Sequence, residues 1–250
     1  MKIGIIGNTR LTFKTILLLL IYKHNIEYVF GLSKEKLSKK VNNYSGIERF
    51  CTANGIKYIT SNDWDDILNI NVDIVFEMGD SRIVPPSFLA KNKVIGNHGA
   101  ILPNVQGAAS LTWGRMLNSG KWGVSLFELN EKIDNGEILV TKEVIYDPDT
   151  TSMNEFVDLC DDTTVECVKE YLLGEFSVKK NRNWEIKLNK HIDSASGVSI
   201  LADALEKNLN IYMPTRNKHD SEVLPHWNND FKNSFKVANS HPYPHWFEER

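Results

Sequence analysis

Short apolar runs rich in β-branched and aromatic residues alternate with helix-length segments along the first 100 residues. The runs include Ile3-Gly4-Ile5-Ile6, Tyr28-Val29-Phe30 and Val72-Asp73-Ile74-Val75-Phe76. Runs of this kind between helical segments are typical of βαβ units, which bury a parallel sheet between two layers of helices. The pattern therefore predicts an α/β fold with a Rossmann-like, doubly wound and mostly parallel sheet.

Regular periodicity continues beyond residue 100 and then weakens. Four segments have the patterns of a helix, two strands and a long amphipathic helix, in the order 110–117, 123–129, 137–144 and 151–173. For the long helix we expect Asp149 or Thr150 as the N-cap and an end near Gly174. We expect one core domain over residues 1–174 and a small, turn-rich C-terminal appendage over 175–250, which packs on the core or on a dimer partner.

Composition excludes several classes of protein. With 42% hydrophobic and 24% charged residues the chain can bury a core, and its net charge of −3 offers no basic excess for nucleic acid or an anionic membrane. Three cysteines without CxxC spacing, Cys51, Cys160 and Cys167, indicate reduced thiols in a cytoplasmic protein rather than disulfides or zinc. The apolar stretch 15–22 is shorter than the roughly 20 residues of a membrane span. We expect a buried helix there.

The segment Gly96-Asn97-His98-Gly99 follows the apolar pair Val94-Ile95, at the carboxyl end of a predicted strand. Open α/β sheets bind ligands at that edge. Histidine is the side chain whose charge is most readily switched near neutral pH, and Asn97 adds an amide beside His98. Taken alone, a histidine more often has a structural role, in which its ring bonds a nearby carbonyl, so its context decides.

A second candidate is Asp134, in the turn Asp134-Asn135-Gly136 between two predicted strands. On its own such a tripeptide is most often only a hairpin turn. His98 and Asp134 say more about function when they are considered as a pair.

The stretch 94–144 resembles the core of the folate-dependent formyltransferase family, which includes methionyl-tRNA formyltransferase, glycinamide ribonucleotide transformylase and the sugar N-formyltransferases. The family pattern is a His with Leu-Pro four residues later, a Gly, a helix often bearing Trp, and an Asp-x-Gly turn. In this chain the pattern reads His98, Leu102-Pro103, Gly107, Trp113 and Asp134-Asn135-Gly136. The separation of His98 from Asp134 agrees with the family's spacing.

The resemblance implies N10-formyltetrahydrofolate as the formyl donor and no metal. Ser81-Arg82-Ile83-Val84-Pro85 resembles the segment whose backbone holds the pterin ring. The candidate cofactor-binding residues are therefore Arg82, Ile83, Val84 and Asp134. Near the chain's end, residues 238–244 are similar to a segment of the longer family members.

A mechanism is also implied. An amine attacks the formyl carbon, His98 and an asparagine amide stabilise the tetrahedral oxyanion, and Asp134 orients His98 and helps to remove the amine proton. The family's catalytic Asn stands two residues before the His, where this chain has Gly96. Asn97 takes that role only if the backbone turns or bulges, because adjacent side chains on an extended strand point to opposite faces.

Residues 7–12 bear on the acceptor. This loop is not the Gly-Ser-rich phosphate cradle of the glycinamide ribonucleotide enzymes, and it lacks the GxGxxG of dinucleotide-binding dehydrogenases. An initiator-tRNA enzyme would call for a longer chain with a basic C-terminal domain. We therefore expect a nucleotide-linked amino sugar, carried by dTDP, UDP or a similar nucleotide, in lipopolysaccharide or O-antigen biosynthesis.

Candidate substrate-binding residues follow from this choice. Asn8 and Arg10, with Lys14 nearby, are placed to contact phosphate near the first helix, although capping and a solvated charge explain them equally well. Gln106 stands where many relatives carry Arg. The aromatic residues Trp227, Tyr243 and Trp246 either stack on a base or pack the appendage.

Expectations about partners and two alternatives complete the interpretation. The protein acts without nucleic acid or membrane as a partner, and a homodimer is compatible with the resemblance. The alternatives are a catalytically inactive formyltransferase-like binding protein and a formyltransferase that acts on another small amine.

Overall fold

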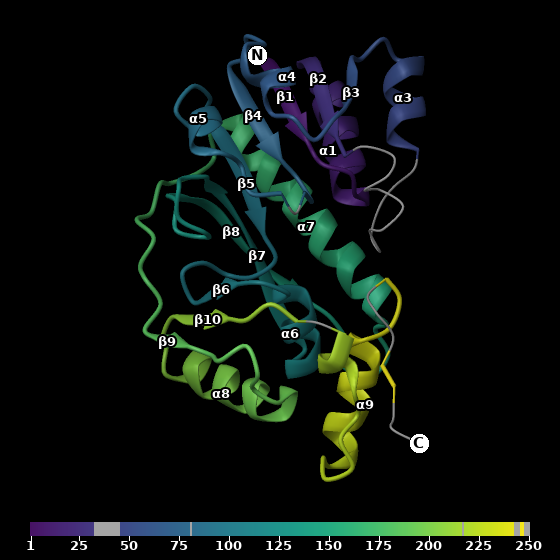
Figure 1. Ribbon diagram of the computed structural model, residues 1–250, viewed down its shortest axis with the longest axis vertical. Helices are drawn as coiled ribbons and strands as arrows, with labels where there is room; N and C mark the ends of the chain where they lie inside the picture. The colour runs from purple at the N-terminus through teal and green to yellow at the C-terminus, as the bar shows by residue number, and fades with distance from the viewer. Residues whose placement is uncertain (33–45, 81, 217, 243–245, 248–250) are drawn as a thin grey trace. The chain divides into compact units, whose positions relative to one another are not determined.

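The computed structural model describes residues 1–32, 46–80, 82–216, 218–242 and 246–247 (Figure 1). The strands are β1 (Lys2–Ile6), β2 (Asn25–Gly31), β3 (Tyr58–Thr60), β4 (Ile74–Glu77), β5 (Val94–His98), β6 (Val105–Gly107), β7 (Lys121–Glu128), β8 (Ile138–Ile145), β9 (Ile186–Lys187) and β10 (Ile211–Met213). The helices are α1 (Arg10–Ile21), α3 (Ile47–Ala53), α4 (Asp65–Leu68), α5 (Pro86–Leu89), α6 (Ser110–Leu117), α7 (Met153–Leu173), α8 (Ser194–Glu206), η1 (Lys218–Ser221) and α9 (Asn229–Ala238). Ser81, Tyr243 and Pro244, named above, lie outside the described residues.

Within these described ranges, seven strands form one sheet in the order β3-β2-β1-β4-β5-β7-β8, and three form another in the order β6-β10-β9. The pairs β1–β2, β1–β4, β2–β3 and β4–β5 are all parallel. The order runs outward from β1 in both directions, as it does in doubly wound sheets. The predicted α/β fold with a mostly parallel sheet is confirmed.

Strand β4 shows why the large sheet is buried on both faces. Val75 belongs to an apolar cluster with Ile67 of α4 and Phe88 of α5. Its neighbour Phe76 is also buried, and its ring lies 6.1 Å from that of Tyr171 on α7. Successive side chains of a strand point to opposite faces, so β4 must be apolar on both faces, as it is from Ile74 to Phe76. This requirement produces the continuous apolar runs from which the sheet was predicted.

The chain forms two compact units, each assembled from three segments. The first comprises Met1–Asn97, Leu126–Val140 and Thr164–Lys179, and the second comprises His98–Ser125, Thr141–Thr163 and Lys180–Arg250. The chain thus passes from one unit to the other several times. The domain division expected at residue 174 stays a prediction.

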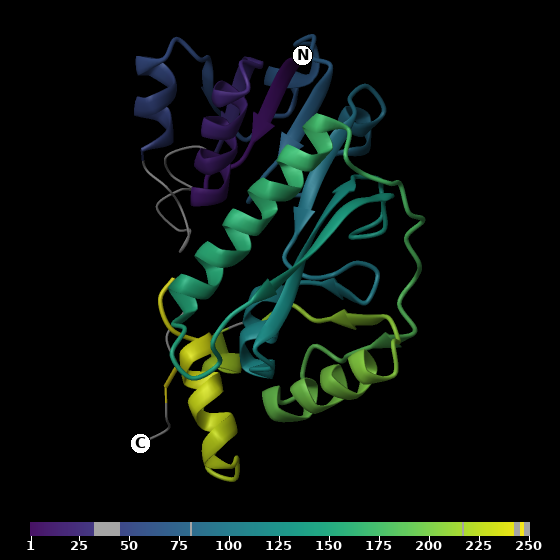
Figure 2. The ribbon, with the colours of Figure 1, turned by 180° about the vertical axis from the view of Figure 1, so that it is seen from behind.

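In the second unit α6 packs against α8 and α9, and both views of the ribbon show the three helices together (Figures 1 and 2). Trp113 of α6 is buried, and its Nε1 donates to the carbonyl of Pro214 at 3.4 Å. On α8, a Cβ at Gly197 would lie 2.9 Å from the Trp113 ring, so the helices approach closely only because this position has no side chain. β9, α8 and β10 follow one another as a small βαβ unit with parallel strands.

The predicted helix over 110–117, the two predicted strands and the end of the long helix are confirmed by α6, β7, β8 and α7. The expected N-cap of α7 is wrong. Ser152 caps it: its Oγ accepts from the Glu155 N–H at 3.3 Å, and the Glu155 carboxylate accepts from the Ser152 N–H at 2.8 Å. This reciprocal pair satisfies two helix-end donors at once. Asp149 and Thr150 instead donate their N–H groups to the Asp147 carboxylate.

Residues 175–250 contain α8 and α9 as well as turns, and these helices were not anticipated. The apolar stretch at 15–22 forms most of α1, in which Ile16 and Leu19 are buried while Ile21 is exposed. None of the helices in the described part of the chain is long and apolar enough to cross a membrane.

Candidate functional site

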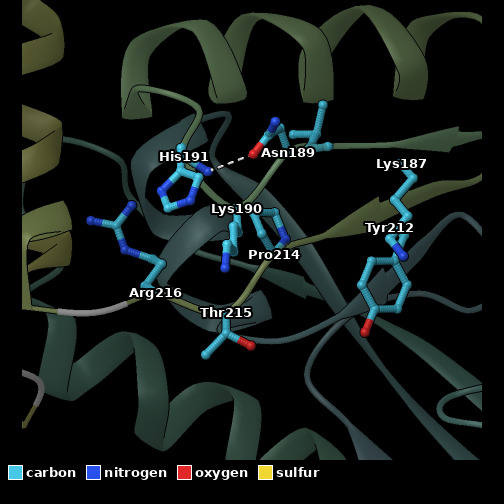
Figure 3. Close-up of a pocket in the computed structure, with 9 residues that line it drawn as sticks. Lys187, Asn189, Lys190, His191, Tyr212, Pro214, Thr215 and Arg216 are labelled. Carbon is cyan, nitrogen blue, oxygen red and sulfur yellow. Dashed lines mark hydrogen bonds between the residues drawn. The ribbon is translucent and has the colours of Figure 1, made fainter.

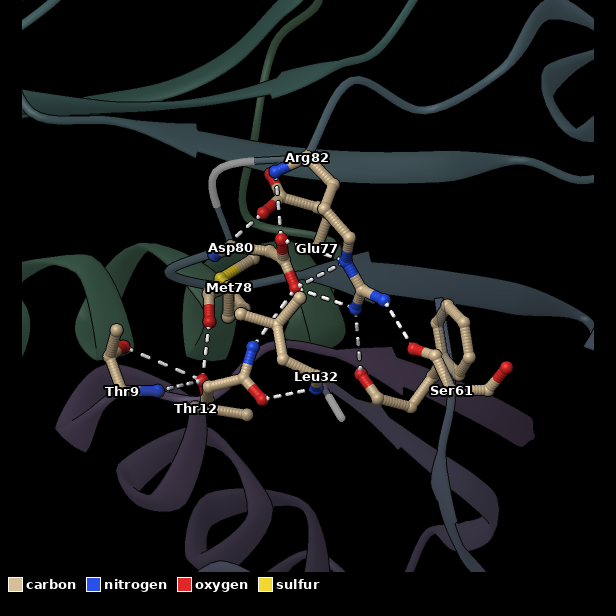
Figure 4. A network of polar contacts seen from close by, with 10 residues as sticks. Thr9, Thr12, Leu32, Ser61, Glu77, Met78, Asp80 and Arg82 are labelled. Carbon is tan, nitrogen blue, oxygen red and sulfur yellow. Dashed lines mark hydrogen bonds and ion pairs between the residues drawn. The ribbon is translucent and has the colours of Figure 1, made fainter. Parts of the chain in front are cut away.

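The carboxyl ends of β1 and β4 are tied together by Thr12 in the first turn of α1 (Figure 4). Its Oγ1 donates to the carbonyl of Met78 at 2.5 Å and accepts from the N–H of Thr9 at 3.0 Å. Gly79 follows with a φ of 74°, and a Cβ there would lie 2.0 Å from the Thr9 hydroxyl. A glycine is required at this close approach. The sheet edge predicted to bind ligand is thus held rigidly.

Asn8, a predicted phosphate contact, is buried in the same network. Its Oδ1 accepts from the Leu32 N–H at 2.6 Å, and its Nδ2 donates to Asp80 at 3.1 Å. Both ends of the amide are therefore engaged by the first unit itself. Arg10 is the first residue of α1, which begins after Thr9. The phosphate roles of Asn8 and Arg10 stay predictions.

Arg82 also has internal partners (Figure 4). Its Nη2 lies 2.7 Å from the Asp80 carboxylate, and its Nη1 donates to the Ser61 carbonyl at 3.0 Å. The guanidinium carbon lies 4.3 Å from the centre of the Phe30 ring. The side chain therefore braces the loop after β4 against β2 and β3.

Glu77, the last residue of β4, was not identified from the sequence. It is only 9% exposed, and its Oε1 accepts from the Asp80 N–H at 2.9 Å. Burial raises the pKa of Glu77 to about 8, and the negative charge of Asp80 adds to this effect. The carboxyl is therefore mainly protonated at neutral pH. The sequence did contain a signal for Glu77, because a carboxyl group stands there at the end of an otherwise apolar run.

A cavity of about 210 Å³ in the first unit adjoins Glu77. Its lining includes Glu77, Arg82, Ile83, Val84, Pro86, Leu89, Phe127, Leu129, Asn130, Glu131, Lys132, Ile133 and Asp134. All four predicted cofactor-binding residues are among them. The cavity is smaller than the roughly 300–1,000 Å³ of pockets for whole drug-sized ligands. It suits one ring system of a larger cofactor, with apolar walls and the three carboxyl groups of Glu77, Glu131 and Asp134.

Asp134 reaches this cavity from the turn between β7 and β8. Its φ of 49° is left-handed, a conformation that Asp tolerates better than most residues. At Gly136 a Cβ would lie only 1.6 Å from the carbonyl oxygen of Glu128. Gly136 is therefore needed for the turn, and Asp134 suits its left-handed position whether or not it takes part in chemistry.

His98 and Asn97 end β5. The pairing of β5 with β4 is regular from Val94 to Gly96, and β5 continues to His98. The Asn97 Oδ1 accepts from the Gly79 N–H at 3.2 Å. No bend brings Asn97 to the His98 side in this strand, which does not favour Asn97 as the oxyanion donor. That role stays a prediction.

In the second unit, the buried His98 ring has its Nε2 3.0 Å from the Val105 carbonyl. Because a carbonyl only accepts, Nε2 carries a hydrogen in either charge state of the ring. Gln106 is also buried, and its amide donates to the Arg182 carbonyl at 2.7 Å. Asp134 belongs to the first unit, and its pairing with His98 stays a prediction.

The chain is similar to known proteins in both sequence and fold. The sequence model described as formyl transferase matches residues 28–162, more than half of the 250-residue chain. Methionyl-tRNA formyltransferase of Fusobacterium nucleatum is 28% identical over 173 residues, which cover 64% of this chain and 56% of that protein. The chain thus spans about half the length of the first sequence relatives.

Two solved structures are similar over almost the whole chain. A sugar N-formyltransferase from a Shewanella species has a TM-score of 0.67 and 15% identity, with 100% of this chain and 93% of that chain covered. The N-formyltransferase from Helicobacter canadensis, in complex with folinic acid and dTDP-3-aminofucose, has a TM-score of 0.65 and 14% identity, with 95% and 80% covered. At these identities the likeness establishes the fold alone.

Proposed function

Because the chain belongs to the formyl transferase family, we propose that it transfers a formyl group from N10-formyltetrahydrofolate to the amino group of a nucleotide-linked amino sugar. The part of this proposal that concerns the formyl donor rests on one observation, the cavity of the first unit. Arg82, Ile83, Val84 and Asp134, which the sequence resemblance assigns to the cofactor, line this one cavity. The apolar walls suit a pterin ring, and the carboxyl groups suit its hydrogen-bond donors.

The transfer needs only acid–base chemistry and charge stabilisation. The amine nitrogen forms a bond to the formyl carbon, the bond from that carbon to N10 breaks, and tetrahydrofolate leaves with a proton on N10. In this proposal Asp134, directly or through a water, takes the proton that the amine loses. His98 Nε2 is held by Val105, so Nδ1 is the nitrogen that acts on the reacting groups and donates to the oxyanion when protonated.

The acceptor is inferred from charge and from similarity of fold. A net charge of −3 provides no broad basic surface for a polynucleotide. The Shewanella and Helicobacter enzymes, both similar over at least 95% of this chain, are named as a sugar N-formyltransferase and an N-formyltransferase with a bound dTDP-amino sugar. These observations support a nucleotide sugar.

A second candidate acceptor is methionyl-tRNA, because the sequence relatives carry the name of that enzyme. The two acceptors differ enough in size and charge for one assay to separate them. An inactive folate-binding relative is the third possibility, since Gly96 occupies the position of the family's catalytic Asn.

The test is release of tetrahydrofolate from N10-formyltetrahydrofolate with a panel of acceptors. The panel holds dTDP- and UDP-linked amino sugars, charged initiator methionyl-tRNA and glycinamide ribonucleotide. We expect turnover with an amino sugar only. Turnover with methionyl-tRNA alone would transfer the assignment to the second candidate, and folate binding without turnover on any amine would favour the inactive relative.

A further inference from the structure

A cavity in the second unit gathers cationic side chains in a chain of negative net charge (Figure 3). Its volume is about 720 Å³. The lining residues are Lys187, Leu188, Asn189, Lys190, His191, Tyr212, Pro214, Thr215 and Arg216. Three of these carry a positive charge at neutral pH, one is a histidine, and none is acidic. The cavity is therefore electropositive.

The cavity lies where the parallel strands β9 and β10 end. Tyr212 of β10 pairs with Lys187 of β9, so the two side chains stand beside each other. The remaining lining residues, 188–191 and 214–216, follow these two strands directly. The carboxyl ends of parallel strands are the edge at which α/β units bind ligands, because both chains turn away there and leave a crevice.

Tyr212 is the aromatic residue in the lining, and it lies beside Lys187 and close to Trp184, which flanks the cavity. Lys187 Nζ lies 5.4 Å and 5.5 Å from the ring centres of Trp184 and Tyr212. Trp184 is 42% exposed, so this aromatic pair presents a face to solvent. Figure 3 shows Lys190 extending into the middle of the cavity, with His191 and Arg216 beside it.

Arg216 provides a fixed charge. Its guanidinium donates to Ser194 Oγ at 2.9 Å, to Asn239 Oδ1 at 3.2 Å and to the Asp220 carbonyl. These three acceptors are neutral atoms that hold the group in place, and the negative charge of the Asp220 side chain offsets part of its positive charge. Burial lowers the pKa of Arg216 to about 10, which still leaves it protonated at neutral pH. Arg216 is half-buried, and solvent screens a partly buried charge less than an exposed one, so it can attract an anion at this edge.

We propose that this cavity binds a nucleoside diphosphate. Lys187, Lys190 and Arg216 attract the diphosphate, with His191 beside them, and Tyr212 with its neighbour Trp184 stacks on the base. The volume lies within the range of ligand pockets, which is roughly 300–1,000 Å³. The ligand is either the nucleotide half of the acceptor or a free nucleotide, and its binding needs neither folate nor an amine.

Calorimetric titration of the whole protein with dTDP, UDP and inorganic pyrophosphate tests this inference. We expect both nucleotides to bind, and the Lys187→Ala/Lys190→Ala variant to weaken their binding at least tenfold. Lys207→Ala is the matched control, because Lys207 is an exposed lysine of the same unit that pairs with Asp203. Tyr212→Leu should weaken dTDP but not pyrophosphate.

The outcomes separate this inference from the proposed reaction. Nucleotide binding that the double variant leaves unchanged, or tRNA binding through these lysines without mononucleotide binding, would overturn it even if formyl transfer occurs. Nucleotide binding without any formyl transfer would support it while the proposed function fails. Competition between dTDP and the amino sugar in the transfer assay would identify the ligand as the acceptor's nucleotide, and non-competitive behaviour would identify a free nucleotide.

A second inference comes from the first unit and concerns Glu77. Glu77 and Gly96 are direct partners on β4 and β5. A Cβ at Gly96 would lie 2.8 Å from a methyl group of Leu129 and 3.4 Å from Glu77 Oε2. The Glu77 carboxyl and Leu129 therefore fill the space that the missing side chain leaves. This space adjoins the cavity that also contains Asp134.

The proton of this carboxyl has a defined place. Oε1 accepts a hydrogen bond from the Asp80 N–H, so the hydroxyl of the neutral acid is at Oε2, the oxygen near Gly96. Neutral carboxyls in apolar sites act as hydrogen-bond donors to developing oxyanions. We infer that Glu77 Oε2–H donates to the formyl oxygen of the donor bound in this cavity. This second inference rests on the proposed function.

The pH profile of kcat, measured beside urea unfolding at each pH, tests the donor role, because a merely structural Glu77 would lower kcat only where the folded state is lost. In the wild type we expect kcat to fall as the pH rises through about 8, where the carboxyl loses its proton. Glu77→Gln, whose amide keeps a donor at every pH, should lower kcat several-fold and remove this alkaline fall. Glu77→Ala should lack activity across the range.

The outcomes distinguish a failure of the role of Glu77 from a failure of the proposed function. An active wild type whose alkaline limb persists in Glu77→Gln would overturn the role of Glu77 and leave the proposed function standing. A wild type that transfers no formyl group to any amine would remove both. Urea unfolding of each variant at pH 6 checks that the folded state is retained.

Discussion

At the scale of single residues, Glu77 makes stability depend on pH. Its pKa is about 8 in the folded protein and 4.5 in the unfolded chain, because burial disfavours the charged form. Between these values the folded state holds a proton that the unfolded chain has lost. The stabilising contribution is therefore complete below pH 4.5 and is lost as the pH rises through 8.

We predict that the urea midpoint of the wild type falls between pH 5 and pH 9 and that Glu77→Gln makes this fall shallower. The glutamine keeps the acceptor for the Asp80 N–H but cannot ionise. Equal slopes for the two proteins, measured by fluorescence, would mean that Glu77 does not hold its proton in the folded state.

His98 and Asp134 are expected to matter for turnover more than for folding. His98→Asn and Asp134→Asn should each lower kcat by about 10²-fold or more, the usual worth of a general acid–base group. Asn tolerates the left-handed conformation of Asp134, so the turn should persist. Steady-state rates and urea midpoints, measured side by side, check this.

Asn97→Ala is the matched control for those two variants. The Asn97 amide accepts from the Gly79 N–H and lies on the strand next to His98. Near-normal kcat in Asn97→Ala would agree with a positioning role, whereas a loss as large as that of His98→Asn would restore Asn97 as an oxyanion donor.

The sequence predicts a residue of the candidate site only where that residue belongs to a short motif of neighbouring residues. Ile83, Val84 and Asp134 were found from a motif, and the structure brings them to one cavity. Glu77 was missed because its cross-strand partner, Gly96, is distant in sequence. Asn8 was assigned to a ligand, although partners 24 and 72 residues away engage its amide. Tertiary partners of this kind leave no local pattern.

At the scale of elements, the β7–β8 turn depends on one position. A Cβ at Gly136 would lie 1.6 Å from the carbonyl of Glu128, so the backbone must move to admit it. We predict that Gly136→Ala lowers the free energy of unfolding by about 2 kcal/mol or more. Glu137→Ala, at the exposed neighbour, should change it by less than about 0.5 kcal/mol. Urea unfolding of both variants tests the pair, and equal midpoints would contradict the prediction.

The elements found from the sequence are those with long, clear periods. The parallel strands were readable because both of their faces are buried, and α6 was readable from its amphipathic pattern. β6, β9 and β10 span two or three residues each, which is too short for any periodicity to register. The cap of α7 was misplaced because four successive residues, 149–152, are all of the types that cap helices, and only the side-chain bonds of Ser152 distinguish them.

At the scale of the whole molecule, the net charge of −3 means that the acceptor meets no broad excess of cations. The affinity for the acceptor should therefore depend only weakly on salt. A nucleotide sugar meets a few cations, and raising NaCl from about 50 to 200 mM should increase its KM by less than about tenfold, since screening is the only effect. A polynucleotide held by six to ten phosphate contacts would lose affinity by about 10³–10⁵ over the same range, because bound counterions are released.

We therefore predict a shallow salt dependence of kcat/KM for the true acceptor. The measurement compares the active amino sugar with methionyl-tRNA at both salt concentrations, with N10-formyltetrahydrofolate saturating. A steep dependence would require a basic surface larger than the cavity of Lys187, Lys190 and Arg216 provides. That result would favour tRNA as the acceptor, whereas a shallow one agrees with three local cations acting on one diphosphate.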